Sequence, residues 1–363
     1  MKHIVIITNP MIAANRSAEV TLSKFLRVVR PSVGSIQVIG GNLSVEDDLN
    51  DIELTSFPII RQPGRIKRIA SVAAIQFKMM SSVIRNGKID QPIYFWIADK
   101  MILPYLAAKA KKMEVNYFIY GNVEKEGRKS TFTALSGRLI RYMASHADYV
   151  CMESASVKKE WHSFEGKRYK LMHLYTDVVT SPAFVNRANV LGMVCRLTPG
   201  KHVLESITAL HRLHEKHPDW RLEIIGSGKQ QQECEDLIKQ LDAESYVDLV
   251  GWVEHSELQS HTKSWKYLLF PSDTEGLPNG LIEMMGYGIP AIASAVGGIA
   301  DVVQDGKNGI LLSECSIDAI SAGIERAILM PRAAYQEMAE NAYQTILDEF
   351  TLSAAQKTAS KYL

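Results

Sequence analysis

The sequence contains few cysteines, and no two of them form a short motif. Cys151, Cys195, Cys234 and Cys315 are scattered over 363 residues without a C-x-x-C. Such spacing excludes a disulfide scaffold and favours reduced thiols in a cytosolic protein. Long apolar runs are lacking too, since none approaches the ~20 residues of a membrane-spanning helix. The apolar residues 4–7 are too short for a signal peptide, and no cleavage site follows them. We therefore expect a cytoplasmic protein.

The chain also lacks a net excess of either charge. The formal charge is +1, but residues 1–186 hold 26 Lys and Arg against 16 Asp and Glu, or +10, and residues 187–363 hold 15 against 24, or −9. Eleven of the cations lie between Arg61 and Lys112, where only Asp90 and Asp99 oppose them. A solvated surface is the ordinary explanation of such a run. An anionic lipid or acceptor is the functional one.

Length and patterning indicate two domains of the α/β class. Short Ile/Val/Leu runs alternate with amphipathic helices in both halves, which predicts parallel strands buried on both faces. We expect two doubly wound domains joined by a linker at Thr180–Asn189. Strands are expected near residues 3–8, 35–40, 92–97, 115–120, 148–152, 169–174, 190–195, 221–225, 247–250, 267–270, 290–293 and 309–312.

The most informative segment is Ser272–Glu283, in which Glu275 and Glu283 stand eight positions apart. A Gly/Pro turn between them predicts a short helix over about residues 279–287. The first N–H groups of a helix lack intrahelical partners and lie at the positive end of its dipole, which suits a phosphate. Carboxylates on either side can bind sugar hydroxyls. The pattern predicts a nucleotide-sugar site with backbone contacts from Pro278, Asn279, Gly280 and Leu281.

The segment resembles the glutamate motif of retaining glycosyltransferases of family 4, the glycosyl transferases group 1, which have the GT-B fold. Further segments follow in the family's order and extend the resemblance over most of residues 190–312. They are Leu191–Lys201, Ile225–Gly228, Gly251–Val253, Phe270–Ser272, Gly286–Pro290 and Val296–Val303. Over the first 185 residues the resemblance rests on layout.

The resemblance implies two Rossmann-like domains that face a central cleft. Residues 1–186, with a returning C-terminal helix at 351–363, would bind the acceptor, and residues 187–350 would bind the nucleotide-diphosphate sugar as co-substrate. The acceptor would be a glycan or a lipid-linked glycan. No metal ion and no other cofactor would be required, and we expect no nucleic-acid partner.

The resemblance also implies roles for four side chains. Arg196 and Lys201 would clamp the diphosphate, the first as a bidentate fork and the second as a point charge. Glu283 would accept hydrogen bonds from the ribose diol. Glu275 would bind hydroxyls of the donor sugar. Ordinary surface cations and charges at a helix terminus are the alternatives.

Three residues at strand ends are weaker candidates. Gly226 could let the backbone approach the nucleotide, and Gly251 and Val253 resemble the segment whose backbone contacts the base in the family. Turns use glycine for positive φ in any case, so a plain turn explains these positions nearly as well.

The first half departs from the family pattern. The loop after the first strand lacks the usual Gly-Gly pair, and we expect Asn15 and Arg16 to contact the diphosphate there. Tyr120 stands where many members have a histidine, and a tyrosine is no base at neutral pH. In a retaining front-face reaction the departing phosphate can itself take the acceptor proton. The departures also leave open a second hypothesis, a non-catalytic GT-B scaffold that binds a nucleotide-sugar or a partner subunit.

Residues 61–88 suggest a membrane contact. An apolar-rich helix carries Arg65, Lys67 and Arg68 at one end and Arg85 and Lys88 at the other. Cations at both ends suit an anionic membrane surface. An ordinary helix packed on a sheet is the alternative. We expect peripheral association with the inner face of the cell membrane, and the sequence predicts no oligomeric state.

Overall fold

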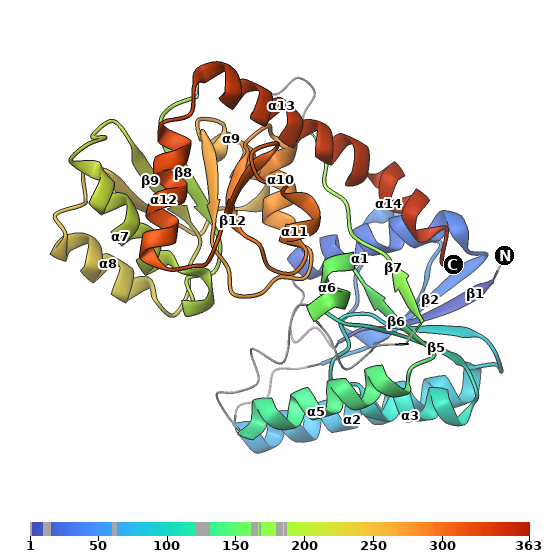
Figure 1. The fold of residues 1–363 in the computed structure, drawn as a ribbon. Coiled ribbons are helices and arrows are strands. Elements are labelled where there is room, and N and C mark those ends of the chain that lie inside the picture. The colour runs from blue at the N-terminus through green and yellow to red at the C-terminus, as the bar shows by residue number, and fades with distance from the viewer. Residues whose placement is uncertain are drawn as a thin grey trace. The chain divides into compact units, whose positions relative to one another are not determined.

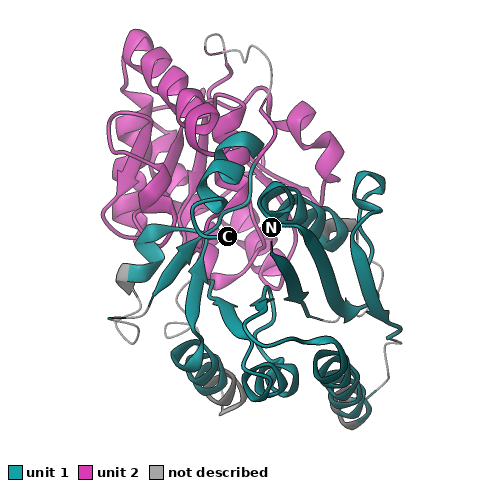
Figure 2. Cartoon of the chain, turned by 90° about the vertical axis from the view of Figure 1, so that its right-hand side faces the viewer, with its two compact units in different colours: residues 1–175, 352–363 teal, residues 176–351 magenta. Residues whose placement is uncertain are grey.

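The computed structural model describes residues 2–9, 16–59, 64–120, 131–160, 166, 168–178, 184 and 187–363. The chain forms two compact units (Figure 2). Unit 1 comprises Met1–Tyr175 and Leu352–Leu363, and unit 2 comprises Thr176–Thr351. The division comes earlier than the expected boundary at residue 186. Thr176 N donates to Phe350 O at 2.9 Å and Val178 packs on the core of unit 2, so these residues belong to that unit.

Unit 1 is built on a seven-stranded parallel sheet in the order β3-β2-β1-β4-β5-β6-β7 (Figure 1). Its strands are β1 (His3–Ile7), β2 (Ser35–Gly41), β3 (Glu53–Phe57), β4 (Pro92–Phe95), β5 (Glu114–Phe118), β6 (Tyr149–Met152) and β7 (Tyr169–Leu171). Its helices are α1 (Arg16–Val29), α2 (Arg65–Asn86), α3 (Ile102–Ala110), α5 (Thr131–His146), α6 (Ala155–Glu160) and α14 (Leu352–Ala359).

Alternate side chains of β1 enter two different cores. Val5 and Ile7 pack with α2, α3 and α5 on one face of the sheet. Ile4 and Ile6 pack with α1 and α14 on the other. Because successive strand residues point to opposite faces, an apolar run such as β1 is buried on both sides. The last helix, α14, is held on α1 in part by Gln356, whose Nε2 donates to Arg27 O at 2.9 Å.

Unit 2 repeats the architecture with six parallel strands in the order β10-β9-β8-β11-β12-β13. This is the doubly wound order, in which the direction of strand addition reverses beside the first strand of the sheet. Its strands are β8 (Val190–Val194), β9 (Arg221–Ile225), β10 (Val247–Gly251), β11 (Tyr267–Phe270), β12 (Ala291–Ser294) and β13 (Gly309–Leu312). Its helices are α7 (Val203–His214), α8 (Gln231–Gln240), α9 (His255–Thr262), α10 (Asn279–Gly286), α11 (Ile299–Val302), α12 (Ile317–Ile328) and α13 (Arg332–Glu349).

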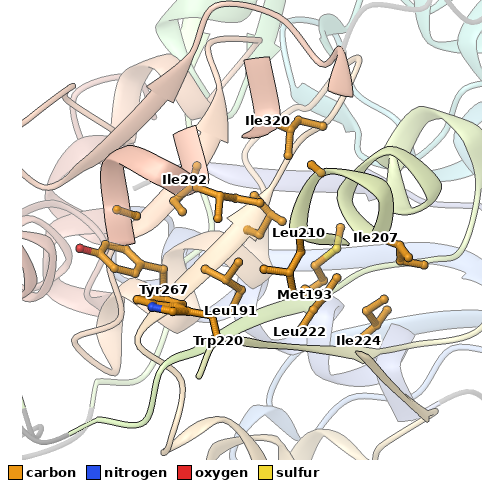
Figure 3. Close-up of a cluster of buried hydrophobic side chains, with 14 of the residues drawn as sticks. Leu191, Met193, Ile207, Leu210, Trp220, Leu222, Ile224, Tyr267, Ile292 and Ile320 are labelled. Carbon is orange, nitrogen blue, oxygen red and sulfur yellow. The ribbon is translucent and has the colours of Figure 1, made fainter. Parts of the chain in front are cut away.

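The sheet of unit 2 also has a core on each face. Leu191 and Met193 of β8 pack with α7 and α12 on one face (Figure 3), and α8 packs on the same cluster. Val190, Phe270 and Ala293 pack with α9, α10 and α11 on the other. The fold class predicted from the sequence is therefore confirmed as two Rossmann-like α/β units.

Candidate functional site

The candidate site lies at the carboxyl ends of the strands of unit 2, where doubly wound sheets bind ligands. The loop after β8 is fixed to the loop after β9 by backbone hydrogen bonds. Cys195 N donates to Ile225 O and Leu197 N to Ser227 O, both at 3.1 Å. Between these two anchors Arg196 is exposed. The backbone that carries the Arg196 guanidinium is therefore fixed at the carboxyl edge of the sheet.

Lys201 is the centre of the polar contacts at this edge. It ends a short 3₁₀ turn, Pro199–Lys201, and its Nζ forms an ion pair with Glu275 Oε1. The same Nζ donates to Ser272 Oγ at 3.2 Å, and Ser272 Oγ donates to Glu275 Oε1 at 2.9 Å. Both charged side chains are mostly buried. The structure therefore brings together a lysine and a glutamate that the sequence assigns to neighbouring parts of one ligand.

The loop after β11 that carries Glu275 is held from two sides. Ser272 N donates to Ser294 Oγ at 2.9 Å, and Ser294 Oγ donates back to Ser272 O at 2.8 Å. On the other side, a Cβ on Gly297 would lie 1.8 Å from Glu275 O, and Gly298 N donates to Gly276 O at 2.7 Å. The glycine pair is thus required by close backbone approach, and it fixes the position of Glu275.

His202 forms a second charged contact beside Lys201. Its Nε2 lies 2.8 Å from Asp273 Oδ1, and its Nδ1 lies 3.3 Å from Glu205 Oε1. A hydrogen bond with Cys315 and the contact with Asp273 raise the pKa of His202 to about 9, against the opposing effect of burial. The imidazole is therefore protonated at neutral pH and adds a cation to this edge.

Helix α10 begins at Asn279, directly after the loop that carries Glu275. Two of the four residues predicted to offer amides to a phosphate cannot do so. Pro278 has no N–H, and Leu281 N donates to Pro278 O at 3.1 Å. The backbone donors left for an anion at this helix end are those of Asn279 and Gly280.

Glu283 lies one turn into α10 and is mostly buried. Tyr287 Oη donates to its Oε1 at 3.0 Å, and His255 Nε2 lies 3.3 Å from the same oxygen. Burial and the neighbouring Glu283 raise the pKa of Tyr287, so the phenol stays protonated and remains a donor. Two side chains that the sequence analysis did not assign therefore orient this carboxylate. Tyr287 lies inside one of the segments that resemble the family, and so does Ser272, which contacts Glu275. His255 lies outside these segments, and nothing in the sequence pointed to it.

The ends of β9 and β10 meet at Gly226 and Gly251. Gly226 N donates to Gly251 O at 2.7 Å, and a Cβ on Gly226 would lie 1.9 Å from Cys195 O. Gly226 thus has a packing reason for being glycine, and its contact with a nucleotide stays a prediction. Val253 packs on the core of unit 2, and the neighbouring Trp252 is 70% exposed.

The predicted residues of unit 1 are described only in part. Asn15 lies outside the described residues. Arg16 begins α1, and its side chain is also outside them. Tyr120 follows β5, and its Oη accepts a hydrogen bond from Ile97 N at 3.3 Å. Burial raises the pKa of Tyr120 well above its usual value, so this phenol is neutral at physiological pH.

Residues 179–345 match the family model "Glycosyl transferases group 1". This segment, a little under half of the chain, is similar to the glycosyl transferases group 1. The expectation from the sequence is confirmed at that level, and the subdivision into retaining family 4 stays a prediction.

Curated relatives align with this chain over part of their length. A putative colanic acid biosynthesis glycosyltransferase, WcaL of Salmonella typhimurium, is 26% identical over 47% of this chain and 43% of its own. A glycogen synthase of Mycobacterium tuberculosis is 31% identical over 47% of this chain and 41% of its own. An uncharacterized glycosyltransferase of Haemophilus influenzae is 32% identical over 34% of this chain and 35% of its own. The chain thus matches less than half of each relative.

Solved structures match both units. HepE of Anabaena, in complex with UDP, superposes with a TM-score of 0.74 at 18% identity, over 99% of both chains. The apo form of the lipopolysaccharide outer core galactosyltransferase WaaB gives a TM-score of 0.70 at 20% identity, over 99% of this chain and 98% of its own. These similarities establish the GT-B fold.

Proposed function

We propose that the protein is a glycosyltransferase that moves a sugar from a nucleoside-diphosphate sugar to an acceptor hydroxyl. The donor is bound at the carboxyl edge of the sheet in unit 2. The observation that carries the proposal is the convergence at this edge of Lys201, Glu275, the beginning of α10 and Glu283. The match of residues 179–345 to the family model and the UDP complex of a structural neighbour support it.

The diphosphate would be held by fixed positive charge. Arg196 offers two parallel N–H donors, Lys201 a compact ammonium, and Asn279 and Gly280 two amides at the positive end of a helix. Negative charge grows on the diphosphate as the bond to the sugar breaks. Groups that already face this charge stabilise the transition state without reorganising. For this reason we propose transfer that requires no metal ion.

The two glutamates would hold the two ends of the donor. Glu283 binds the ribose diol through its carboxylate oxygens, with Tyr287 fixing the orientation of the carboxylate. Glu275 binds hydroxyls of the sugar and exchanges its contact with Lys201 for contacts with the ligand. The roles rest on the position of Glu275 before the first turn of α10 and of Glu283 one turn inside it.

The reaction would retain the configuration at the transferred carbon. The bond from that carbon to the diphosphate oxygen breaks, and the bond to the acceptor oxygen forms on the same face of the sugar. The acceptor proton passes to the departing diphosphate oxygen, so no side chain is needed as a base. We place the acceptor, a glycan or a lipid-linked glycan, on unit 1. Tyr120 would bind there as a neutral hydrogen-bonding group, and Asn15 and Arg16 would contact the diphosphate.

The test is release of nucleoside diphosphate from a panel of nucleoside-diphosphate sugars, with and without an acceptor extract. The wild-type protein should release product from at least one donor. The Arg196→Ala, Lys201→Ala variant should lose roughly a hundredfold or more in turnover, as expected when charge-stabilising groups are removed.

The matched control is Lys216→Ala, Lys239→Ala, which removes two exposed cations of unit 2 outside the site and should keep full activity. Wild-type turnover in the Arg196 and Lys201 variant would contradict the proposal. Donor binding without any release would instead favour the non-catalytic scaffold.

A further inference from the structure

Helices α2, α3 and α5 form one outer layer of unit 1. All three pack on the same face of its sheet, and α3 contacts both of the others (Figures 1 and 2). Ile75, Met79 and Val83 of α2 are among the side chains that face the sheet. The opposite sides of the three helices face away from the sheet.

The outer layer contains no carboxylate. The three helical sequences, over residues 65–86, 102–110 and 131–146, include eight Lys and Arg but no Asp or Glu. Asp90 and Asp99 follow α2 and β4 in loops, and Asp148 follows α5 and pairs with Lys109 at 3.3 Å. A solvated helix normally mixes both charge signs, so the composition of the whole layer indicates a preference for anions.

The exposed side of α2 combines apolar and cationic side chains. Phe77 is 55% and Ile84 48% exposed, and they are seven residues apart on the side opposite Ile75 and Met79. Exposed Lys78 and Arg85, also seven apart, each follow one of them in sequence and form a second row about 100° around the helix. A stripe of large apolar side chains thus runs along the helix next to a row of cations.

The other two helices continue this surface. Leu106 on α3 and Tyr142 on α5 are each 44% exposed, and Arg138 is exposed one turn before Tyr142. Among the described residues, half of the large hydrophobic side chains that are exposed lie on these three helices. Scattered exposed hydrophobics need no explanation, but a group of them on one cationic layer does.

We propose that the outer layer, α2, α3 and α5, docks onto the surface of an anionic lipid bilayer. The cations meet lipid phosphates, and Phe77, Ile84, Leu106 and Tyr142 enter the boundary between headgroups and acyl chains. In the described residues no helix is long and apolar enough to cross a membrane. The proposed contact is with the surface of the bilayer. The proposal extends the sequence-based expectation for residues 61–88 to three helices. The side chains of Arg65 and Arg68 lie outside the described residues.

The apolar stripe distinguishes a bilayer from other polyanions. A nucleic acid or a soluble acidic protein is attracted by Lys67, Lys78 and Arg85 alone. A bilayer gains in addition from burying Phe77 and Ile84. The proposal does not depend on the proposed sugar transfer, because it concerns side chains of unit 1 only.

The test is flotation of the full chain with vesicles of phosphatidylcholine alone or of equal parts phosphatidylcholine and phosphatidylglycerol. Wild-type protein should float only with the anionic vesicles and lose binding steeply as salt rises. Lys67→Glu, Lys78→Glu, Arg85→Glu should lower the partition coefficient by about a hundredfold or more, since each cation contributes a factor of about five. Phe77→Gln, Ile84→Gln should lower it by about tenfold.

The charge control is Lys216→Glu, Arg221→Glu, Lys239→Glu, which makes the same charge change at exposed positions of unit 2. It should float like the wild type, and circular dichroism should show that all variants are folded. Protein that stays at the bottom of the gradient at low salt overturns the proposal. So does equal loss in the control variant, which indicates net charge alone, or full binding after Phe77→Gln, Ile84→Gln, which indicates a general polyanion surface.

Discussion

Lys201 Nζ and Glu275 Oε1 are paired at the strand ends of unit 2, with 18% and 14% of the two side chains exposed. Ser272 bridges them, since its hydroxyl accepts from the lysine and donates to the glutamate. Without a ligand the ammonium is therefore largely neutralised by the carboxylate. A diphosphate that approaches Lys201 competes with Glu275, and the carboxylate becomes available to the hydroxyls of the sugar.

This pairing gives opposite expectations for binding and turnover. In Glu275→Gln the charge of Lys201 is no longer neutralised, and we expect the bare nucleoside diphosphate to bind as tightly as before or up to about tenfold more tightly. Turnover of the complete donor should fall by roughly a hundredfold, because the contact to the sugar is lost. Calorimetry and a product-release assay measure the two. Weaker diphosphate binding in this variant than in the wild type would refute the assigned role.

Tyr287 should matter for the nucleotide through Glu283. Tyr287→Phe removes the hydroxyl that donates to Glu283 Oε1 and should weaken nucleoside-diphosphate binding by about 1 kcal/mol, or roughly fivefold. Tyr335→Phe is the matched control, since it removes a buried hydroxyl that donates to Lys266 O at 3.2 Å. Both variants should lose similar stability, but only the first should lose affinity. Equal affinities would show that Tyr287 is purely structural.

Gly297 should tolerate no side chain. An alanine there has a positive φ of 48° and places its Cβ 1.8 Å from Glu275 O, so the loop that carries Glu275 must move. We expect Gly297→Ala to lose stability by roughly 2–4 kcal/mol and most of its activity. Gly306→Ala also has a positive φ, 73°, but meets only the end of Arg326 at 3.3 Å.

The Gly306 variant isolates the cost of the backbone angle, about 1 kcal/mol. Urea unfolding of the two variants separates the contributions. If both lose the same free energy of unfolding, the close approach of Gly297 to Glu275 is not an energetic constraint.

His202 should make stability depend on pH. Its pKa in the folded protein, about 9, is above the ~6.5 of an unfolded imidazole. A raised pKa contributes stability that is fully present below pH ~6.5 and is lost as the pH rises through about 9. Between pH 7 and 9.5 the wild type should lose about 1 kcal/mol that His202→Asn does not lose.

Asparagine is chosen for this variant because residue 202 has a φ of 50°, which asparagine tolerates. Thermal unfolding across this pH range gives the comparison. Parallel profiles for the wild type and the variant would show that the contacts of His202 with Cys315 and Asp273 do not hold its proton.

Much of the fold could be predicted because its strands are continuous apolar runs. The six strands of unit 2 lie within one residue of their expected bounds. Strand β3 was missed, since Glu53, Thr55 and Ser56 make it a polar strand at the edge of the sheet. The four-residue α11 was too short to show a helical period.

The site was predictable only where its residues are close in sequence. The segment from Ser272 to Glu283 could be recognised from its sequence alone. The pairing of Lys201 with Glu275 spans more than seventy residues and depends on how the hydrogen bonds of two loops fix their positions. The contact of His255 with Glu283 likewise arises from the tertiary structure. The expected amide of Pro278 was a chemical error, because proline has no N–H.

The most direct test of the account is the affinity of unit 2's strand-end site for nucleoside diphosphates, measured by calorimetry on the full chain. We predict that one nucleoside diphosphate of the common set binds the wild type. Arg196→Ala, Lys201→Ala should bind it roughly a hundredfold more weakly, because two charged contacts to the diphosphate are lost. Lys216→Ala, Lys239→Ala should bind it as the wild type does. Equal affinity in all three proteins, or no binding of any nucleoside diphosphate, would contradict the account.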